Sequence, residues 1–465
     1  MNSCRGAAAA IDAKPGAPPG RARFSIINAC AVAAAAILMV PAEAYAQPAP
    51  ADIQSALKSG GKALRDVQAF YEARGYRPLW VRGGSLSPAA GEVLRLIEDA
   101  HFDGLNPAAY RPRELASAIN KARGGSPKAL AKAETLLSDA FAAYVLDVRR
   151  PRDVGMIYVD RELAPTTGSA SGVLTAAAAA PSLEHYVTRL GWMHPVYGQL
   201  RSAFAAADRA GRINSAQAAL LSINMDRARA LPARVGGRHI LVDAAAARLY
   251  LYENGEVRDT MKVVVGKPDL QTPMMAGLIR YAAVNPYWNI PPDLVRDRIA
   301  PNVLDQGVSY LRSKRYDVLS DWSDKATIVN PSKVDWKAVA AGRTEIRVRQ
   351  RPGSDNAMGK MKFMFPNEQG VYLHDTPDKD LFKEADRGAS AGCVRVEDAP
   401  RLARWLFGKP ITLKSSKPEQ RVDMPVPVPV YITYLTAAPE GPGVAFRKDV
   451  YNRDSVAMAQ LRARS

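Results

Sequence analysis

The first half of the chain has the hydrophobic spacing of α-helices. Stretches such as IQSALKSGGKALRDVQAFYEARGY place apolar side chains three and four positions apart, which gives each helix one apolar face. The triplet LSP supplies Ser87 as an N-cap and Pro88 at the first helical position. Two more helical stretches are predicted at 183–208 and 214–230. The pattern therefore predicts a helical scaffold domain over residues 50–232.

The hydrophobic period changes after Pro232, where apolar and polar residues alternate as they do in β-strands. The Asn-Gly pair of ENGE, at 253–256, is typical of the tight turn of a β-hairpin. A mixed segment at 293–345 interrupts the strands and is predicted to be an insertion. The chain is thus predicted to be an α+β protein, with a separate, β-rich, β-sandwich-like domain over 238–415. Further strands at 424–458 are expected to pack on that domain.

The first 46 residues have the pattern of a secretory signal peptide. Arg21 and Arg23 precede the apolar run FSIINACAVAAAAILMV, and small residues then lead to AYA at 44–46, an A-x-A cleavage pattern. An uncleaved membrane anchor is the alternative, although the run is slightly short for a bilayer span. Lipidation of Cys30 fits less well, because this cysteine lies within the run rather than after it. We therefore expect export to the periplasm, with no stable membrane span after cleavage.

Basic residues outnumber acidic ones along the chain. The formal net charge is +17, and removal of the first 46 residues, which carry four basic and two acidic side chains, leaves +15. This surplus favours an anionic partner, such as lipid headgroups or an acidic wall polymer. The sequence has no nucleic-acid-binding motif, so nucleic acid is not expected as a partner. One remaining cysteine and five scattered histidines form no metal-ligand pattern, and neither a metal nor a cofactor is expected.

Cleavage would leave Cys393, within SAGCVRV, as the single cysteine, because Cys4 and Cys30 lie in the removed segment. Such a chain has no intramolecular disulfide, and its thiol is either reactive or a buried structural group. His374 closes the predicted strand GVYLH, nineteen residues upstream. A cysteine nucleophile needs a base and donors for the oxyanion, which the amides of Gly392 and Cys393 could supply. The pairing favours a catalytic dyad over the alternative of a packed strand-end histidine.

These residues resemble a known catalytic motif. YLHDTP at 372–377, the loop that follows, and SAGCVR at 390–395 are similar to the motif of the L,D-transpeptidase, or YkuD-type, catalytic domain. VVVGKPDLQTP, NPYWNIPP and RQRPGSDNAMGKMKFMFPN resemble the large periplasmic, YcbB-like branch of that family. FYEARGYRPLW and DGLNPAAY resemble the helical scaffold domain of the same branch. The resemblance extends from about residue 60 to residue 455.

The resemblance implies roles for individual residues. Cys393 would be the nucleophile and His374 its base, held by the backbone carbonyl of Asp375, while a role for the Asp375 carboxylate stays open. The amides of Gly392 and Cys393 would bind the oxyanion, and the insertion at 293–345 would cap the cleft. Substrate contacts are implied for Arg395, Ser390, Trp288 and Tyr372. A structural ion pair is the alternative for the arginine, and plain packing is the alternative for the tryptophan.

The implied reaction is peptidoglycan cross-linking in cell-wall biogenesis. Cys393 would attack the bond between meso-diaminopimelic acid and D-alanine in a tetrapeptide stem, and a second stem would accept the acyl group as a 3→3 cross-link. Tetrapeptide stems would be both donor and acceptor, and a carbapenem would label the thiol. An outer-membrane protein is an alternative acceptor, and water would make the enzyme an L,D-carboxypeptidase or endopeptidase. A non-catalytic wall-binding protein is the alternative from a different class.

The sequence departs from the family pattern at two places. Many members carry a histidine where Ala391 stands, although the larger branch tolerates small residues there. The branch also usually carries a peptidoglycan-binding module where this chain has only the stretch of about 197–230. That stretch is too short for such a module, so glycan binding is expected to rest on the catalytic cleft and the basic surface.

Overall fold

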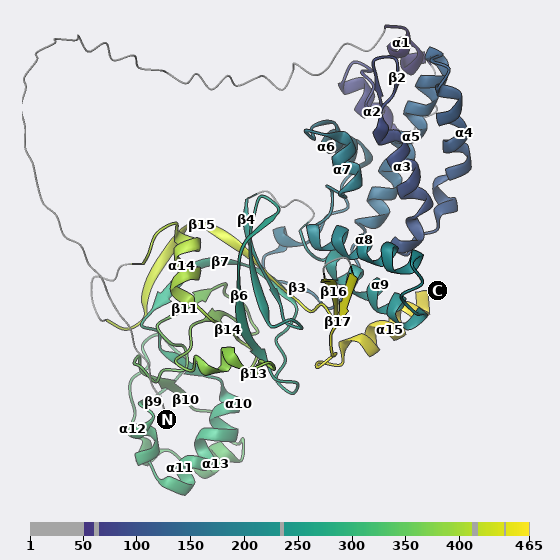
Figure 1. The fold of residues 1–465 in the computed structure, drawn as a ribbon. Coiled ribbons are helices and arrows are strands. Elements are labelled where there is room, and N and C mark those ends of the chain that lie inside the picture. The colour runs from purple at the N-terminus through teal and green to yellow at the C-terminus, as the bar shows by residue number, and fades with distance from the viewer. Residues whose placement is uncertain (1–50, 60–64, 233–236, 412–416, 441–442, 465) are drawn as a thin grey trace, which may run out of the picture. The chain divides into compact units, whose positions relative to one another are not determined.

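The computed structural model describes residues 51–59, 65–232, 237–411, 417–440 and 443–464 (Figure 1). These residues belong to one compact unit. The predicted signal peptide, and the anchor that is its alternative, lie outside the described residues. Each helix in the described part is too short or too polar to span a bilayer.

The first part of the described chain is helical, as the hydrophobic spacing predicts. The long helix α5 lies against α1, α4 and α6, and its buried face forms the centre of a large apolar core. Ser87 and Pro88 begin α3 as predicted, although the serine hydroxyl makes no capping hydrogen bond. The helices of this part are α1 (Ala51–Ser59), α2 (Arg65–Ala73), α3 (Pro88–Glu98), α4 (Pro112–Ala122), α5 (Pro127–Val148), α6 (Ala170–Ala178), α7 (Leu183–Thr188), α8 (Pro195–Arg209) and α9 (Ser215–Arg229).

A mixed sheet forms the second part. Its strand order is β11-β12-β14-β6-β5-β4-β15-β7-β3, and β11 also pairs with β7, so the sheet wraps around a core of its own. Helix α14 (Ala399–Phe407) buries its apolar face in that core. The strands after the helical part are β4 (Arg238–Asp243), β5 (Arg248–Glu253), β6 (Glu256–Gly266), β7 (Met275–Val284), β11 (Met361–Met364), β12 (Leu373–His374), β13 (Gly388–Ser390), β14 (Val394–Val396) and β15 (Gln420–Thr433).

The predicted hairpin is present between β5 and β6. Glu253 pairs with Glu256 across a two-residue turn. Asn254 and Gly255 have φ angles of 53° and 84°. Two consecutive positive φ angles match the right-handed twist of the flanking strands, and asparagine followed by glycine tolerates them best.

The predicted insertion is a lobe with its own apolar core, in which Ile290, Val318 and Val348 are buried. Its antiparallel sheet has the order β8-β10-β9. The lobe extends from residue 288 to residue 350, slightly beyond the predicted 293–345. Its elements are β8 (Trp288–Ile290), α10 (Pro292–Leu294), α11 (Ala300–Gln306), α12 (Ser309–Ser313), β9 (Tyr316–Leu319), α13 (Trp336–Ala340) and β10 (Arg347–Gln350).

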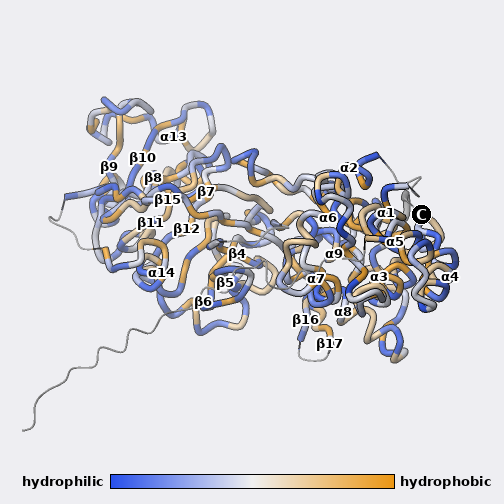
Figure 2. Tube along the Cα trace, turned by 90° about the horizontal axis from the view of Figure 1, so that it is seen from above, coloured by the Kyte–Doolittle hydropathy of each residue, from blue (hydrophilic) through white to orange (hydrophobic). Residues whose placement is uncertain are grey.

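The helical part and the strand-rich part are in contact, because a single apolar core joins the helices to the sheet. Leu241, Tyr252 and Tyr431 are strand residues that are buried in the same apolar cluster as the helices. Strand β3 (Ile157–Tyr158), from within the helical part, pairs in parallel with β7. Apolar segments of both halves lie side by side in Figure 2. The change of hydrophobic period thus marks a change of secondary structure and not a gap in packing.

The C-terminal segment also differs from its prediction as strands on the catalytic domain. Only β15 lies in the sheet, whereas β16 (Ala437–Glu440) and β17 (Gly443–Phe446) form a hairpin that contacts α8. Residues Arg453–Arg464 form helix α15, which packs on α9. The contact is fixed by a buried ion pair between Arg227 and Asp454, with 2.7 Å between their atoms. Burial of Leu435 and Ala437 in the helical core draws this segment to the scaffold.

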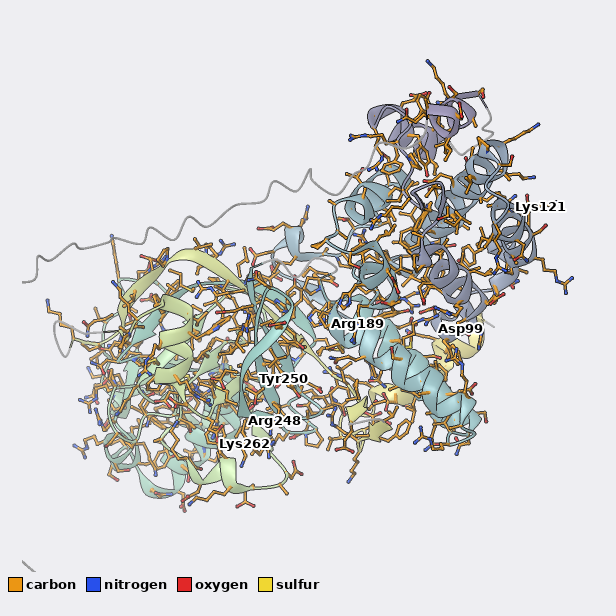
Figure 3. The ribbon with its side chains drawn as sticks, turned by 45° about the horizontal axis from the view of Figure 1, so that its top comes forward. Asp99, Lys121, Arg189, Arg248, Tyr250 and Lys262 are labelled. Carbon is orange, nitrogen blue, oxygen red and sulfur yellow. The ribbon has the colours of Figure 1, made fainter. Side chains whose placement is uncertain are left out.

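Two cations lie opposite each other on the β5–β6 hairpin, Arg248 and Lys262 (Figure 3). Arg248 donates to Thr260 Oγ1 at 3.0 Å, and Lys262 Nζ donates to the Phe382 carbonyl at 2.7 Å. These acceptors offset the repulsion between like charges that face each other across a strand pair. Part of the chain's positive charge is thus placed on β6, the strand next to β14.

Candidate active site

Two short parallel strands bring the predicted nucleophile and base to one face of the sheet. In the pairing of β12 with β14, Leu373 lies opposite Val394 and His374 lies opposite Arg395. Leu373 and Val394 are buried in the apolar core. Successive side chains alternate between the faces of a strand, so His374 and Cys393 both lie on the other face. They are diagonal neighbours, because Cys393 directly precedes β14.

His374 is held in one tautomer by the backbone. The side chain is 2% exposed, and Nδ1 lies 2.5 Å from the carbonyl oxygen of Asp375. Because a carbonyl oxygen only accepts hydrogen bonds, Nδ1 carries the proton and Nε2 keeps a free lone pair. The imidazole is therefore prepared to accept a proton at Nε2.

The carboxylate of Asp375 is used elsewhere. Its Oδ1 accepts from Lys379 Nζ at 2.7 Å, and its Oδ2 accepts from the Lys360 amide at 2.8 Å. Asp375 thus contacts the histidine through its carbonyl, as the resemblance implies. The carboxylate fixes the strand end from which that carbonyl projects.

Ser390 forms a tight turn around the cysteine. Its hydroxyl accepts from the Gly392 amide at 3.1 Å and donates to the Cys393 carbonyl at 2.6 Å. The side chain is 3% exposed, so this hydroxyl shapes the loop and is not presented to a ligand. Gly392 has a φ angle of 110°, a conformation that L-residues with a Cβ rarely adopt. Because the Gly392 amide is engaged within the loop, it is not a free oxyanion donor in this conformation.

The thiol and the imidazole are both neutral at rest. Burial raises the pKa of the Cys393 thiol to about 11, and a hydrogen bond from the Tyr372 backbone and the charge of Arg395 only partly oppose this. Burial and, secondarily, Arg395 lower the pKa of His374 to about 3. Cys393 Sγ is half-buried and donates to the Gly370 carbonyl at 3.5 Å. The pair is therefore a thiol beside a neutral base, not a preformed thiolate–imidazolium pair.

Arg395 and Tyr372 lie on the same face as the dyad. Arg395 is half-buried, and in the described part of the chain its Nε is buried without a hydrogen-bond partner. The charge of Asp378 acts on the guanidinium, so a substrate role for Arg395 stays a prediction. The Tyr372 ring lies 6.0 Å from the His374 ring, and burial raises the pKa of its phenol. Both side chains interact electrostatically with the thiol.

A buried lysine belongs to the same face and was not predicted from the sequence. Lys362 on β11 lies opposite His374, and its Nζ is 2.6 Å from Glu419 Oε1 and 3.4 Å from the Tyr287 carbonyl. The alternation in KMKFMF, with Met361 and Phe363 in the core, contains the information that places this lysine on the site face. No local pattern indicates Glu419, which follows Lys362 by more than fifty residues in the sequence.

Trp288 lies on the inserted lobe. It pairs with Gln350 across β8 and β10 and is partly buried against the lobe's own core. This position matches the packing alternative, and the neighbouring residue Tyr287 is the one that contacts Lys362. Ala391, where many relatives carry a histidine, is exposed. A small side chain at that position leaves no cavity in the core.

No group of three or more histidine, cysteine or acidic side chains within the described ranges is arranged to hold a metal ion. The chemistry available at this face comes from a thiol, an imidazole, two cations and backbone amides.

The neutral thiol leads to a first prediction. Alkylation of Cys393 by iodoacetamide should speed up about tenfold per pH unit from pH 7 to pH 10 without reaching a plateau, because this displacement uses the thiolate and not the His374-assisted attack proposed for a carbonyl substrate, and the thiol pKa is about 11. The rate is followed by mass spectrometry of the peptide that contains Cys393. The same peptide in denaturant should reach its plateau near the ordinary thiol pKa of about 8.5. A plateau below pH 8 in the native protein would show a preformed thiolate and contradict the prediction.

Comparison with known protein families defines the class of this site. Residues 237–429 match the model of the L,D-transpeptidase catalytic domain, YkuD, and residues 65–204 match that of the scaffold domain. Residues 237–429 are thus a YkuD-type L,D-transpeptidase catalytic domain, preceded by a helical scaffold domain over residues 65–204. The family resemblance that the sequence motifs suggested is confirmed.

Individual proteins and solved structures are also similar to parts of this chain. A protein of Haemophilus influenzae, itself named as a candidate L,D-transpeptidase, is 31% identical over 241 residues, which are 50% of this chain and 48% of the relative. The chain therefore matches about half the length of this curated relative. An L,D-transpeptidase structure from Mycobacterium smegmatis is 15% identical, covering 42% of this chain and 59% of that one, with a TM-score of 0.22. The Ldtfm–avibactam carbamoyl enzyme is 15% identical, covering 43% and 50%, with a TM-score of 0.21.

Proposed function

We propose that this protein is a peptidoglycan L,D-transpeptidase that forms 3→3 cross-links through an acyl-enzyme on Cys393. The observation that carries the proposal is the shared sheet face of Cys393 and His374 within a YkuD domain. There the histidine presents a free Nε2 on the same face as the thiol. The predicted signal peptide supports action in the periplasm, and the positive net charge suits an anionic wall.

The first half-reaction uses the neutral dyad. The thiol rotates from the Gly370 carbonyl toward His374 and gives its proton to Nε2 while Sγ bonds to the donor carbonyl carbon. The carbonyl oxygen takes the negative charge, and the Cys393 amide donates to it. When the carbonyl re-forms, the bond to D-alanine breaks and the proton on His374 passes to the leaving amine. A thioester on Cys393 remains.

The second half-reaction reverses the proton path. An amine of an acceptor stem attacks the thioester carbon and loses its proton to Nε2. The carbon–sulfur bond breaks, and the thiol regains the proton, so the enzyme is restored. Arg395, with a buried Nε that lacks a partner in the described part, suits a carboxylate of a peptide stem. Lys362 is already neutralised by Glu419 and is proposed to shape the cleft.

Incubation with tetrapeptide muropeptides tests this proposal, with the products separated and weighed by mass spectrometry. We expect a dimer that has lost one D-alanine, with a cross-link between the two diaminopimelyl residues. Free tripeptide without any dimer would instead identify a carboxypeptidase. Transfer of the tripeptide to an amine of an added protein, such as an outer-membrane protein, would identify an enzyme that attaches proteins to the wall. Unchanged tetrapeptide, together with an unreactive Cys393, would support a non-catalytic wall-binding protein.

A further inference from the structure

A buried threonine connects the loop after β6 to the turn that carries Cys393. Thr272 is fully buried and lies in the segment 267–274 between β6 and β7. Its hydroxyl accepts from the Gly266 amide at 2.8 Å and donates to the Gly392 carbonyl at 2.8 Å. The single hydroxyl proton of Thr272 is thus donated to the carbonyl of Gly392, the residue directly before the proposed nucleophile.

The hydrogen bond fixes the direction of the Cys393 amide. In a planar trans peptide, the carbonyl of one residue and the N–H of the next point in opposite directions. Because the Gly392 carbonyl points at the buried Thr272, the Cys393 N–H points away from it. The Gly392 amide is engaged by Ser390, so the Cys393 amide is the donor that this turn can offer to a substrate carbonyl.

We propose that Thr272 is a positioning residue that aims the Cys393 amide at the oxyanion of the acyl-transfer step. The inference rests on the proposed nucleophilic role of Cys393. The hydroxyl does not touch the substrate, and it acts by holding one peptide plane. Oxyanion stabilisation depends on donors that are aimed before the reaction begins, so a rotated plane lowers the rate even when the thiol stays in place.

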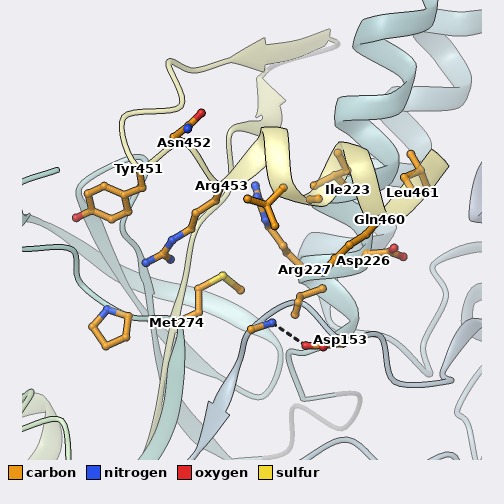
Figure 4. A pocket seen from close by; sticks show the side chains of 15 residues that line it. Asp153, Ile223, Asp226, Arg227, Met274, Tyr451, Asn452, Arg453, Gln460 and Leu461 are labelled. Carbon is orange, nitrogen blue, oxygen red and sulfur yellow. Dashed lines mark hydrogen bonds between the residues drawn. The ribbon is translucent and has the colours of Figure 1, made fainter. Parts of the chain in front are cut away.

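The C-terminal segment supports this threonine from behind. Arg453 donates to the Thr272 carbonyl at 2.9 Å and to Gln271 Oε1 at 3.1 Å. The Tyr451 hydroxyl donates to the Gly266 carbonyl at 2.6 Å. Figure 4 shows Tyr451 and Arg453 beside Met274 in a cavity of about 510 Å³ that lies between this loop and α9 and α15. The segment that packs on the scaffold therefore also fixes the loop that positions the nucleophile's amide.

Two reactions of the same thiol separate positioning from folding. Iodoacetamide forms a carbon–sulfur bond and releases iodide without an oxyanion. With p-nitrophenyl acetate, the sulfur attacks the ester carbonyl through an oxyanion and p-nitrophenolate leaves. We expect Thr272→Val, which keeps the shape and removes the hydroxyl, to lower acetylation of Cys393 by at least about tenfold. The upper limit is the roughly 100- to 1,000-fold loss that removal of an oxyanion donor causes. Alkylation should change by less than about threefold at the same pH.

Two further variants keep the test decisive. Thr272→Ser retains the hydroxyl and should restore acetylation to within about threefold of the unaltered protein. Tyr451→Phe removes the hydroxyl's hydrogen bonds to the Gly266 carbonyl and the Thr272 amide and should give a smaller loss of the same kind, which provides the test if Thr272→Val does not fold. A merely structural role predicts that the rates of acetylation and alkylation decrease by the same factor, and that result would overturn the proposal. Equal acetylation by the valine variant and the unaltered protein would also overturn it.

This test does not depend on the wall substrate. If muropeptides are not turned over but the acetylation-to-alkylation ratio still falls in Thr272→Val, the proposed function fails and the positioning role stands. If muropeptides are cross-linked and the ratio does not change, the function stands and the positioning role fails. Alkylation of the unaltered protein without any acetylation would show that the turn offers no oxyanion donor.

Discussion

Replacing Cys393 with alanine is expected to abolish cross-linking, with a loss of at least about 10⁴-fold, because removal of a covalent nucleophile leaves only binding and the oxyanion donors. Turnover of tetrapeptide muropeptides measures this loss. The mass of the protein after exposure to a carbapenem gives an independent measure, since acylation adds the mass of the drug to the thiol-containing peptide. The unaltered protein should gain one such adduct and the variant none.

Ala391→Ser is the matched control for this substitution. It changes an exposed residue of the same loop and should keep turnover within about threefold of the original. If Cys393→Ala retained turnover, the nucleophile would lie elsewhere. The absence of any adduct on the original thiol, together with unchanged muropeptides, would favour the wall-binding alternative.

Replacing His374 with glutamine is expected to slow acylation of Cys393 by about 10²- to 10⁴-fold near pH 7, the range that a general base contributes. The expected pH dependence is more specific. The depressed histidine pKa of about 3 keeps the base neutral through the whole accessible range, and the raised thiol pKa of about 11 keeps the nucleophile protonated. The original protein should therefore acylate at a nearly constant rate from pH 5 to pH 9.

The His374→Gln variant lacks the base, so it must react through the small fraction of Cys393 that is thiolate. Its rate should rise about tenfold per pH unit, so the difference from the original protein narrows as the pH increases. Acylation by p-nitrophenyl acetate across this range measures both profiles. His185→Gln, at an exposed position on α7, is the control and should keep the flat profile. A bell-shaped profile with an acid limb near pH 6.5 in the original protein would contradict the neutral dyad.

Much of the fold can be read from local patterns. The three-and-four spacing of apolar residues predicts the helices of the scaffold, and the Asn-Gly pair predicts the β5–β6 hairpin with its two positive φ angles. These features depend on neighbouring residues and on the intrinsic limits of φ, so they need no distant partner. The contact between the two parts could not be predicted, because the second face of a half-buried strand can pack on any apolar surface that the fold brings to it.

The candidate site, like the fold, could be predicted from the sequence only in part. One cysteine outside the predicted signal peptide and a histidine one loop upstream of it are enough to nominate Cys393 and His374. The functions of Ser390 and Asp375 are different in kind from what their types suggest. The serine hydroxyl forms its hydrogen bonds within the turn. The aspartate contacts His374 through its backbone carbonyl, while its carboxylate binds Lys379. A side chain's type states what it can bind, and only its surroundings decide what it does bind.

The sequence by itself determined the helical first half and the strand-rich second half, the hairpin, the Cys393 thiol with its upstream histidine, and the resemblance to L,D-transpeptidases. Tertiary structure alone decided that Glu419 neutralises Lys362 and that Thr272 holds the peptide before Cys393. The physical reason is distance along the chain. Turns and amphipathic faces arise from residues within a few positions of each other, whereas strand register and hydrogen bonds between segments more than one hundred residues apart are set only when the whole core packs.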